Sequence, residues 1–269
     1  MKEMTGRIVG SVVLLAAMAV VYLVTVWTTA GQRVDQRVYE AMYGADSWRD
    51  LLHRVGFQRV TDPRLWLVAA VVVIVLGLLA RRRGSIIALL VLPALGVVVA
   101  RMLRTEILPR PELMDIARAA FNTFPSGHTA AAAGCVAAAI RAAPRVVAPV
   151  VAVVGAMWTT VVGQGLMEVG AHRPSDIVGS LFMVGAAMIL VPDSTRSGVP
   201  PGVAALTAVV AAIGPLVWAV HTGHLVLAAI GVVAAGVFAL LTAGIGTPAR
   251  RGVPIAEPFV PQSRWVAGR

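Results

Sequence analysis

Residues 8–29, IVGSVVLLAAMAVVYLVTVWTT, contain no charged side chain and are long enough to cross a lipid bilayer as one helix. Further apolar stretches follow along the chain, and none of them alternates polar and apolar residues as a barrel strand would. We place these stretches at residues 65–80, 85–103, 126–142, 146–167, 176–191, 203–221 and 225–245. The sequence therefore predicts an all-α integral membrane protein with a helix at each stretch.

The composition of the 269-residue chain supports this class, because 58% of the residues are hydrophobic and 13% are charged. Soluble domains have about 45–50% apolar and about 25% charged residues. The proportions exclude a soluble enzyme, a disordered chain and a secreted disulfide-rich protein. The net charge of +10 does not indicate nucleic-acid binding, because the arginines are scattered at the ends of apolar stretches. Cys135 is the single cysteine, so we expect no disulfide and no thiolate metal site.

Two segments differ from the apolar stretches. Residues 31–64 form a charged connector, in which four apolar residues between 48 and 55 recur at helical spacing. That spacing predicts an amphipathic helix on the membrane surface. Residues 247–269 are rich in Pro, Gly and Arg without apolar periodicity, which predicts a basic, disordered tail.

The basic residues of the short loops predict an orientation. Arginines 81–83 occupy a turn of only a few residues, and such positive turns face the cytoplasm. Both termini are then cytoplasmic, and the loops after the first, third, fifth and seventh helices face outward. We expect a multi-pass protein of the plasma membrane whose site, if it has one, is extracytoplasmic.

Polar residues suited to chemistry gather in two of these outward loops. In the first, Ser126, Gly127 and His128 begin an apolar helix directly after Pro125. The free amides and positive end of a helix N-terminus favour an anion such as phosphate, and His128 stands where it could donate a proton. The same tetrapeptide is also compatible with an ordinary capped helix start that carries an interfacial histidine.

In the second loop, His172 and Asp176 are four residues apart, and Pro174 is suited to a first helical turn. The carboxylate can then orient the ring of His172 as a nucleophile, although such a pair can also be a purely structural hydrogen bond. Arg110 adds a planar double donor suited to phosphate oxygens on the same membrane face.

Taken together and in this order, Arg110-Pro111, Pro125-Ser126-Gly127-His128 and His172/Asp176 resemble the type-2 phosphatidic-acid phosphatases, a superfamily that shares its fold with vanadium haloperoxidases. The resemblance covers residues 1–191 and implies a six-helix lipid-phosphatase core that includes the connector. Residues 192–246 would then form two additional C-terminal transmembrane helices.

The resemblance implies a metal-independent lipid phosphatase that needs no cofactor and acts on a membrane lipid phosphate, of the polyprenyl diphosphate or phosphatidate type. His172 would attack phosphorus to form a phosphohistidine, Asp176 would orient its ring, and His128 would protonate the leaving oxygen. Phosphate would be held by Arg110, Arg104 and the amides of Ser126 and Gly127. The alternatives are a lipid phosphotransferase and a non-catalytic lipid-binding or transport protein.

The chain departs from the family pattern at two places. The lysine of the first motif falls on Leu103, and we take the neighbouring Arg104 as its substitute. The Ser-Arg pair of the third motif falls on Gly165-Leu166, so a phosphate-binding arginine is missing there. Arg173 either compensates for it or is an interfacial anchor. The sequence does not specify the oligomeric state.

Overall fold

A computed structural model of the chain describes residues 2–44, 60, 62–81, 83–115, 121–191 and 199–243. Within these ranges the structure contains nine α-helices and no strand, as expected for an all-α protein. The amphipathic helix predicted near residues 48–55 and the tail 247–269 lie outside the described residues.

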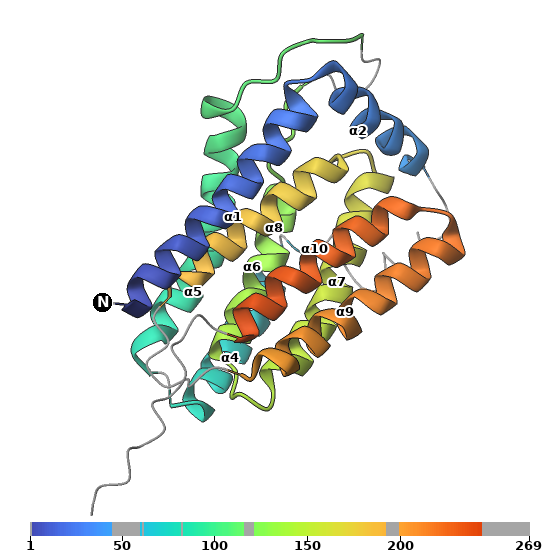
Figure 1. Ribbon diagram of the computed structural model, residues 1–269. Helices are drawn as coiled ribbons and strands as arrows, with labels where there is room; N and C mark the ends of the chain where they lie inside the picture. The colour runs from blue at the N-terminus through green and yellow to red at the C-terminus, as the bar shows by residue number, and fades with distance from the viewer. Residues whose placement is uncertain are drawn as a thin grey trace, which may run out of the picture.

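Each predicted apolar stretch coincides with a helix (Figure 1). In chain order these are α1 (Lys2–Val26), α4 (Pro63–Leu79), α5 (Ile86–Met102), α6 (Gly127–Ala142), α7 (Ala148–Glu168), α8 (Pro174–Ile189), α9 (Pro201–Thr222) and α10 (Leu225–Ala243). Five helical segments of the described chain are long and apolar enough to cross a membrane, namely those containing α1, α5, α7, α9 and α10. These segments indicate a multi-pass membrane protein, whereas the count of six core spans plus two stays a prediction.

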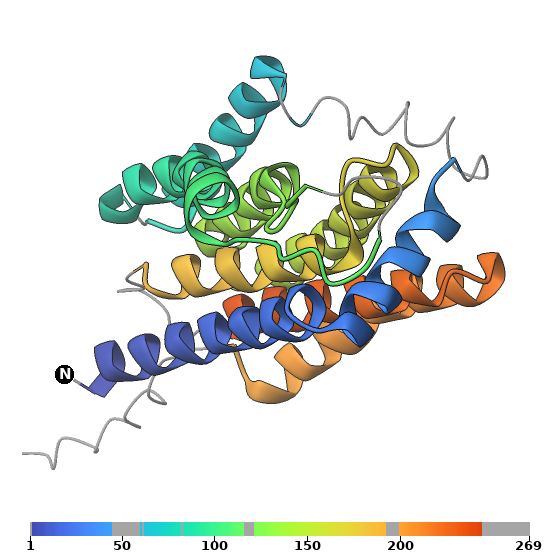
Figure 2. The same cartoon turned by 90° about the horizontal axis from the view of Figure 1, so that it is seen from above.

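Helices α6 and α8 form the centre of the bundle. Helix α8 packs against α1, α6 and α10, and α6 packs against α5 and α7 (Figures 1 and 2). Half of the residues of α6 are buried alanines, and such small side chains let membrane helices approach closely. A small residue also permits a close contact at Gly179 of α8, where an added Cβ would lie 2.3 Å from the ring of Phe124. Phe124 belongs to the segment that leads into α6, so this segment packs directly against α8.

The last two helices are an antiparallel pair that belongs to the same bundle. Helix α9 ends at Gly223, whose φ of +73° makes the tight turn into α10. Helix α10 packs against α7 and α8, and its Ile230 and Phe238 are fully buried in the common core. The pair thus covers one side of the helices that carry the second polar loop.

A further helix, α2 (Thr29–Met42), was not predicted and occupies part of the expected surface connector. It follows α1 after a bend and lies across the end of the bundle (Figure 1). Its inward face is polar, with Gln32, Asp35, Gln36 and Tyr39 all buried. A hydropathy pattern cannot reveal such a helix, because its buried side is not the apolar one.

Candidate active site

The site begins at the N-terminus of α6. Ser126 is the N-cap residue, and its hydroxyl accepts a hydrogen bond from the amide of Thr129 (3.1 Å). The backbone amide of Ser126 donates to the carbonyl of Asp176 (3.2 Å). It is therefore not free to bind a phosphate, contrary to the prediction from the sequence. The amides of Gly127 and His128 donate to no described residue. The anion-binding donors of this helix end are therefore shifted by one residue along the chain.

The N-terminus of α8 supplies the second half. His172 Nδ1 lies 3.3 Å from Asp176 Oδ2, and the same oxygen accepts the backbone amide of Arg173 at 2.7 Å. Asp176 thereby caps the helix and orients the imidazole at once. Because Nδ1 faces a carboxylate, a neutral ring in this position places its proton on Nδ1 and its lone pair on Nε2. His172 is 3% exposed and Asp176 is fully buried.

These two helix ends meet. The rings of His128 and His172 are 6.1 Å apart between centroids, with their planes at 68°. The hydroxyl of Ser180, on α8, lies within hydrogen-bond distance of the carbonyls of both Ser126 (2.9 Å) and Asp176 (2.7 Å). Two loops that are more than forty residues apart in the chain are thus joined so that both imidazoles can contact one phosphoryl group.

Arg110 lies in the loop after α5, and its guanidinium is buried without a hydrogen-bond partner among the described residues. This holds for each of its three nitrogens. Burial lowers the pKa of Arg110 from its ordinary value, and the charge of Arg173 acts in the same direction, while Asp176 and Asp35 oppose them. A buried guanidinium without a partner is costly, and an anion placed against it would remove that cost.

Arg104 precedes Arg110 in the chain and lies in a π-helical turn over Leu103–Ile107 that continues α5. Its charge is close enough to act on His128. The side-chain amide of Asn122, a residue outside the sequence motifs, donates to the carbonyls of Arg104 (3.2 Å) and Leu108 (2.6 Å). Asn122 therefore ties the turn that bears Arg104 to the segment leading into α6.

Arg173 is fully buried, which excludes the role of an interfacial anchor. Its guanidinium donates to Gln36 Oε1 from Nε (3.1 Å) and NH2 (3.0 Å), and to Thr123 Oγ1 from NH1 (3.0 Å). It also lies over the ring of Tyr39, at 5.3 Å from the centroid. Arg173 thus connects the loop that carries His172 to α2 and to the segment that precedes α6. Neither contact could be predicted from the spacing of residues in the sequence.

The missing third-motif arginine leaves an apolar position. Leu166 is 2% exposed and packs with Ala131, Val60 and Ala171 in a small hydrophobic cluster. The structure therefore puts hydrocarbon where the family pattern has a guanidinium, immediately behind His172.

Asp35 of α2 is a further charged group near the site. Its carboxylate accepts the amide of Ser175 (3.1 Å) and the hydroxyl of the same residue (2.6 Å). Burial raises the pKa of Asp35 to about 6, with Asp176 acting in the same direction and the Ser175 hydrogen bonds opposing it. Its place in the site could not be inferred from the sequence, because Asp35 stands among other charged residues of the connector.

The described residues contain no group of three or more His, Cys, Asp or Glu side chains arranged to hold a metal ion. The site instead combines two imidazoles, one carboxylate bonded to an imidazole, and arginine and amide donors. Such a donor set suits the oxygens of a phosphate group.

The segment that forms this site resembles a known protein family. Residues 106–196 match the family model of the PAP2 superfamily, whose members are typically phosphatases that act on phosphate esters. No curated protein and no solved structure matches the chain. The matched residues include Arg110, His128, His172 and Asp176, so the segment that forms the candidate site is similar to the PAP2 superfamily, as its motifs indicate.

Proposed function

We propose that the protein is a lipid phosphatase that hydrolyses a phosphomonoester or diphosphate of a membrane lipid through a phosphohistidine. The observation that carries the proposal is the buried guanidinium of Arg110, which has no hydrogen-bond partner among the described residues and lies close enough to Asp176 for that carboxylate to act on it. A cation kept buried without a partner is suited to an anionic substrate that arrives from outside the protein.

In the first step, Nε2 of His172 attacks the terminal phosphorus while Asp176 holds Nδ1. The new N–P bond forms as the bond between phosphorus and the lipid oxygen breaks, and His128 donates a proton to that oxygen. Arg110, Arg104 and the amides of Gly127 and His128 stabilise the charge on the equatorial oxygens. Catalysis of this kind depends on positioning and on charge stabilisation.

In the second step, a water molecule attacks the phosphohistidine. His128, now neutral, takes a proton from the water as the new O–P bond forms and the N–P bond breaks. Inorganic phosphate leaves, and both histidines return to their starting protonation states. The same two residues therefore serve both halves of the reaction.

Because arginines and amides supply the positive charge, we expect phosphate release by the purified protein in detergent to be unaffected by EDTA. Orthovanadate, which adopts the five-coordinate geometry of the transition state, is expected to inhibit competitively. The assay compares a prenyl diphosphate with a phosphatidate, and the preferred one identifies the substrate class. Loss of activity in EDTA with recovery on adding Mg²⁺ would contradict the mechanism.

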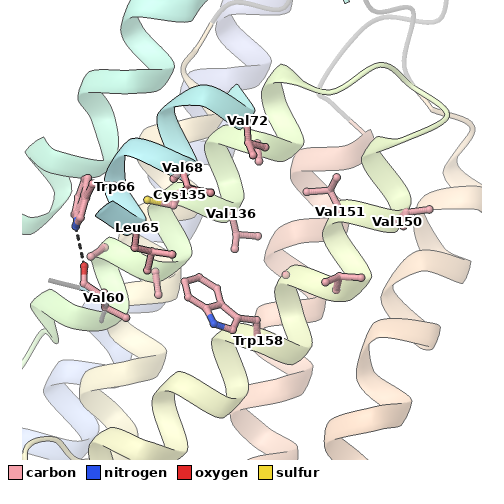
Figure 3. Close-up of a pocket in the computed structure, with 16 residues that line it drawn as sticks. Val60, Leu65, Trp66, Val68, Val72, Cys135, Val136, Val150, Val151 and Trp158 are labelled. Atoms are coloured by element: carbon pink, nitrogen blue, oxygen red, sulfur yellow. Dashed lines mark hydrogen bonds between the residues drawn. The ribbon is translucent and has the colours of Figure 1, made fainter. Parts of the chain in front are cut away.

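The lipid character of the substrate is supported by an apolar cavity of about 400 Å³ between α4, α6 and α7 (Figure 3). The described residues that line it are all Val, Leu, Ala, Gly, Cys or Trp. The indole N–H of Trp66 adds no free donor to the cavity, because it donates to the carbonyl of Val60 at 2.7 Å. A cavity of this size and lining is suited to a hydrocarbon chain.

The cavity is connected to the catalytic residues through α6 and a shared cluster. Ala131 lines it and follows His128 by one helical turn, with Cys135 one turn further on. Ala131 also packs in the cluster that includes Leu166 and Ala171, the residue before His172. A lipid with its phosphate between the histidines would therefore have an apolar path along α6.

Filling the cavity should separate long-chain from short-chain substrates. Cys135→Phe is expected to lower kcat/KM for a long-chain lipid phosphate roughly ten- to a hundredfold, because each methylene that loses its burial costs about 0.8 kcal/mol. Hydrolysis of a short, water-soluble phosphate ester should change little. The matched control is Val98→Phe, on an exposed position of α5. Equal losses on both substrates would show that the cavity does not bind the chain.

We further propose that the site faces the extracytoplasmic side. Arg81 and Arg83 lie at the start of α5, whereas Arg104 and Arg110 follow its end, so the full length of the helix separates the positive turn from the site. A positive turn on the cytoplasmic side then leaves the site on the outer side.

A further inference from the structure

Helix α2 touches both halves of the candidate site through one face. Gln32, Asp35, Gln36 and Tyr39 recur at spacings of three and four residues, which places them on one side of the helix. All four are buried although all are polar. Buried polar groups are stable only when hydrogen-bonded, so the partners of this face show what it is built to hold.

The first partner is the loop that carries Arg110. The side-chain amide of Gln32 donates to the carbonyl of Pro111 (2.7 Å). The hydroxyl of Tyr22, from α1, donates to the carbonyl of Pro109. The residues on both sides of Arg110 are therefore fixed through their backbones. The guanidinium itself is left without a protein partner.

The second partner is the loop between α7 and α8 that carries His172, together with the first turn of α8. Asp35 binds the amide and hydroxyl of Ser175, Gln36 binds the guanidinium of Arg173, and the hydroxyl of Tyr39 donates to the carbonyl of Gly170 at 3.0 Å. Residues on both sides of His172 are thus held by α2.

The close approach of α2 is built into the loop at Gly170. This residue has a φ of +70°, and an added Cβ would lie 2.7 Å from the ring of Tyr43 and 2.9 Å from the hydroxyl of Tyr39. Only glycine satisfies both the conformation and the space. The loop is therefore shaped to receive α2.

We propose that α2 is a positioning element that fixes the nucleophile-bearing loop relative to the Arg110 loop, with Asp35 and Gln36 as positioning residues that touch no substrate. The inference rests on the proposed phosphatase function. A nucleophile and a phosphate-binding arginine on separate loops must keep their geometry to within about 0.5 Å for efficient transfer. A single rigid helix bonded to both segments meets that requirement, since Pro111, Gly170 and Arg173 lie outside any helix and only Ser175 belongs to the first turn of α8.

The test uses Asp35→Ala in the full chain. We expect kcat to fall roughly ten- to a hundredfold with KM changed less than about threefold, because misplacement of about 1 Å costs on that order. Asp35→Asn keeps an acceptor for the Ser175 amide and should recover part of the loss. The matched control is Arg37→Gln, on the exposed face of the same helix.

A double-mutant cycle with Ser175→Ala distinguishes positioning from general stability. If Asp35 acts through Ser175, the double variant should be no slower than Asp35→Ala alone, because both changes remove the same hydrogen bond. Thermal unfolding in detergent is measured on each variant. A lower unfolding temperature with unchanged kcat per folded molecule, or strictly additive losses, would overturn the inference while leaving the proposed function intact. Failure of the wild-type protein to release phosphate from any tested ester would instead overturn the proposed function.

Discussion

The variant His172→Ala is expected to lose turnover by a factor on the order of 10⁵ or more, because it lacks the atom that forms the covalent intermediate. Its ring is oriented by Asp176 at 3.3 Å and lies 6.1 Å from that of His128. No other described imidazole stands in that position, so no neighbour can replace it. Phosphate release from the preferred lipid, measured in detergent, checks this expectation.

The matched control is His221→Ala, at the exposed end of α9 and outside the site. It should retain full activity. A second readout is the phosphoenzyme itself, since wild-type protein stopped during turnover should carry an acid-labile phosphate that His172→Ala lacks. Full turnover by His172→Ala would refute the mechanism, and an inactive wild-type protein on both lipid classes would favour a non-catalytic lipid-binding role.

The long apolar helices could be predicted from the sequence because hydropathy is a local property. The residues of α1 and α10 show it without any knowledge of their neighbours. The meeting of His128 with His172 could also be predicted, because each stands at a helix start and matches a motif of known order. The family match over residues 106–196 confirms that resemblance.

What the sequence could not reveal are the contacts made by residues without a motif. Helix α2 could not be predicted, because its buried face is polar. Charged residues in a connector normally indicate a solvent-exposed segment. Asn122 and Gln36 stabilise the site through partners 14 to 137 residues away in the chain. Such pairs arise from the tertiary arrangement alone, so they cannot be predicted from a single sequence.

The same reasoning explains why the roles of the arginines could not be separated beforehand. Arg110 and Arg173 both stand in polar loops next to motif residues, and both are suited to phosphate. The structure distinguishes them by their partners. Arg173 is bonded to Gln36 and Thr123, whereas the nitrogens of Arg110 have no partner among the described residues.

Arg110→Leu is therefore expected to have opposite effects on activity and on stability. Each charge-assisted hydrogen bond to phosphate is worth about 1.5–3 kcal/mol, so losing a bidentate pair should lower kcat/KM about a hundred- to a thousandfold. The free protein, however, loses a buried cation without a partner, whose charged form the fold disfavours because its pKa is lowered by burial. Its unfolding temperature in detergent should thus stay level or rise, and the additional stabilisation by vanadate should disappear. Arg101→Leu, at an exposed position near the end of α5, is the control that should change neither property. A destabilised but fully active Arg110→Leu protein would show that this guanidinium serves the fold and not the phosphate.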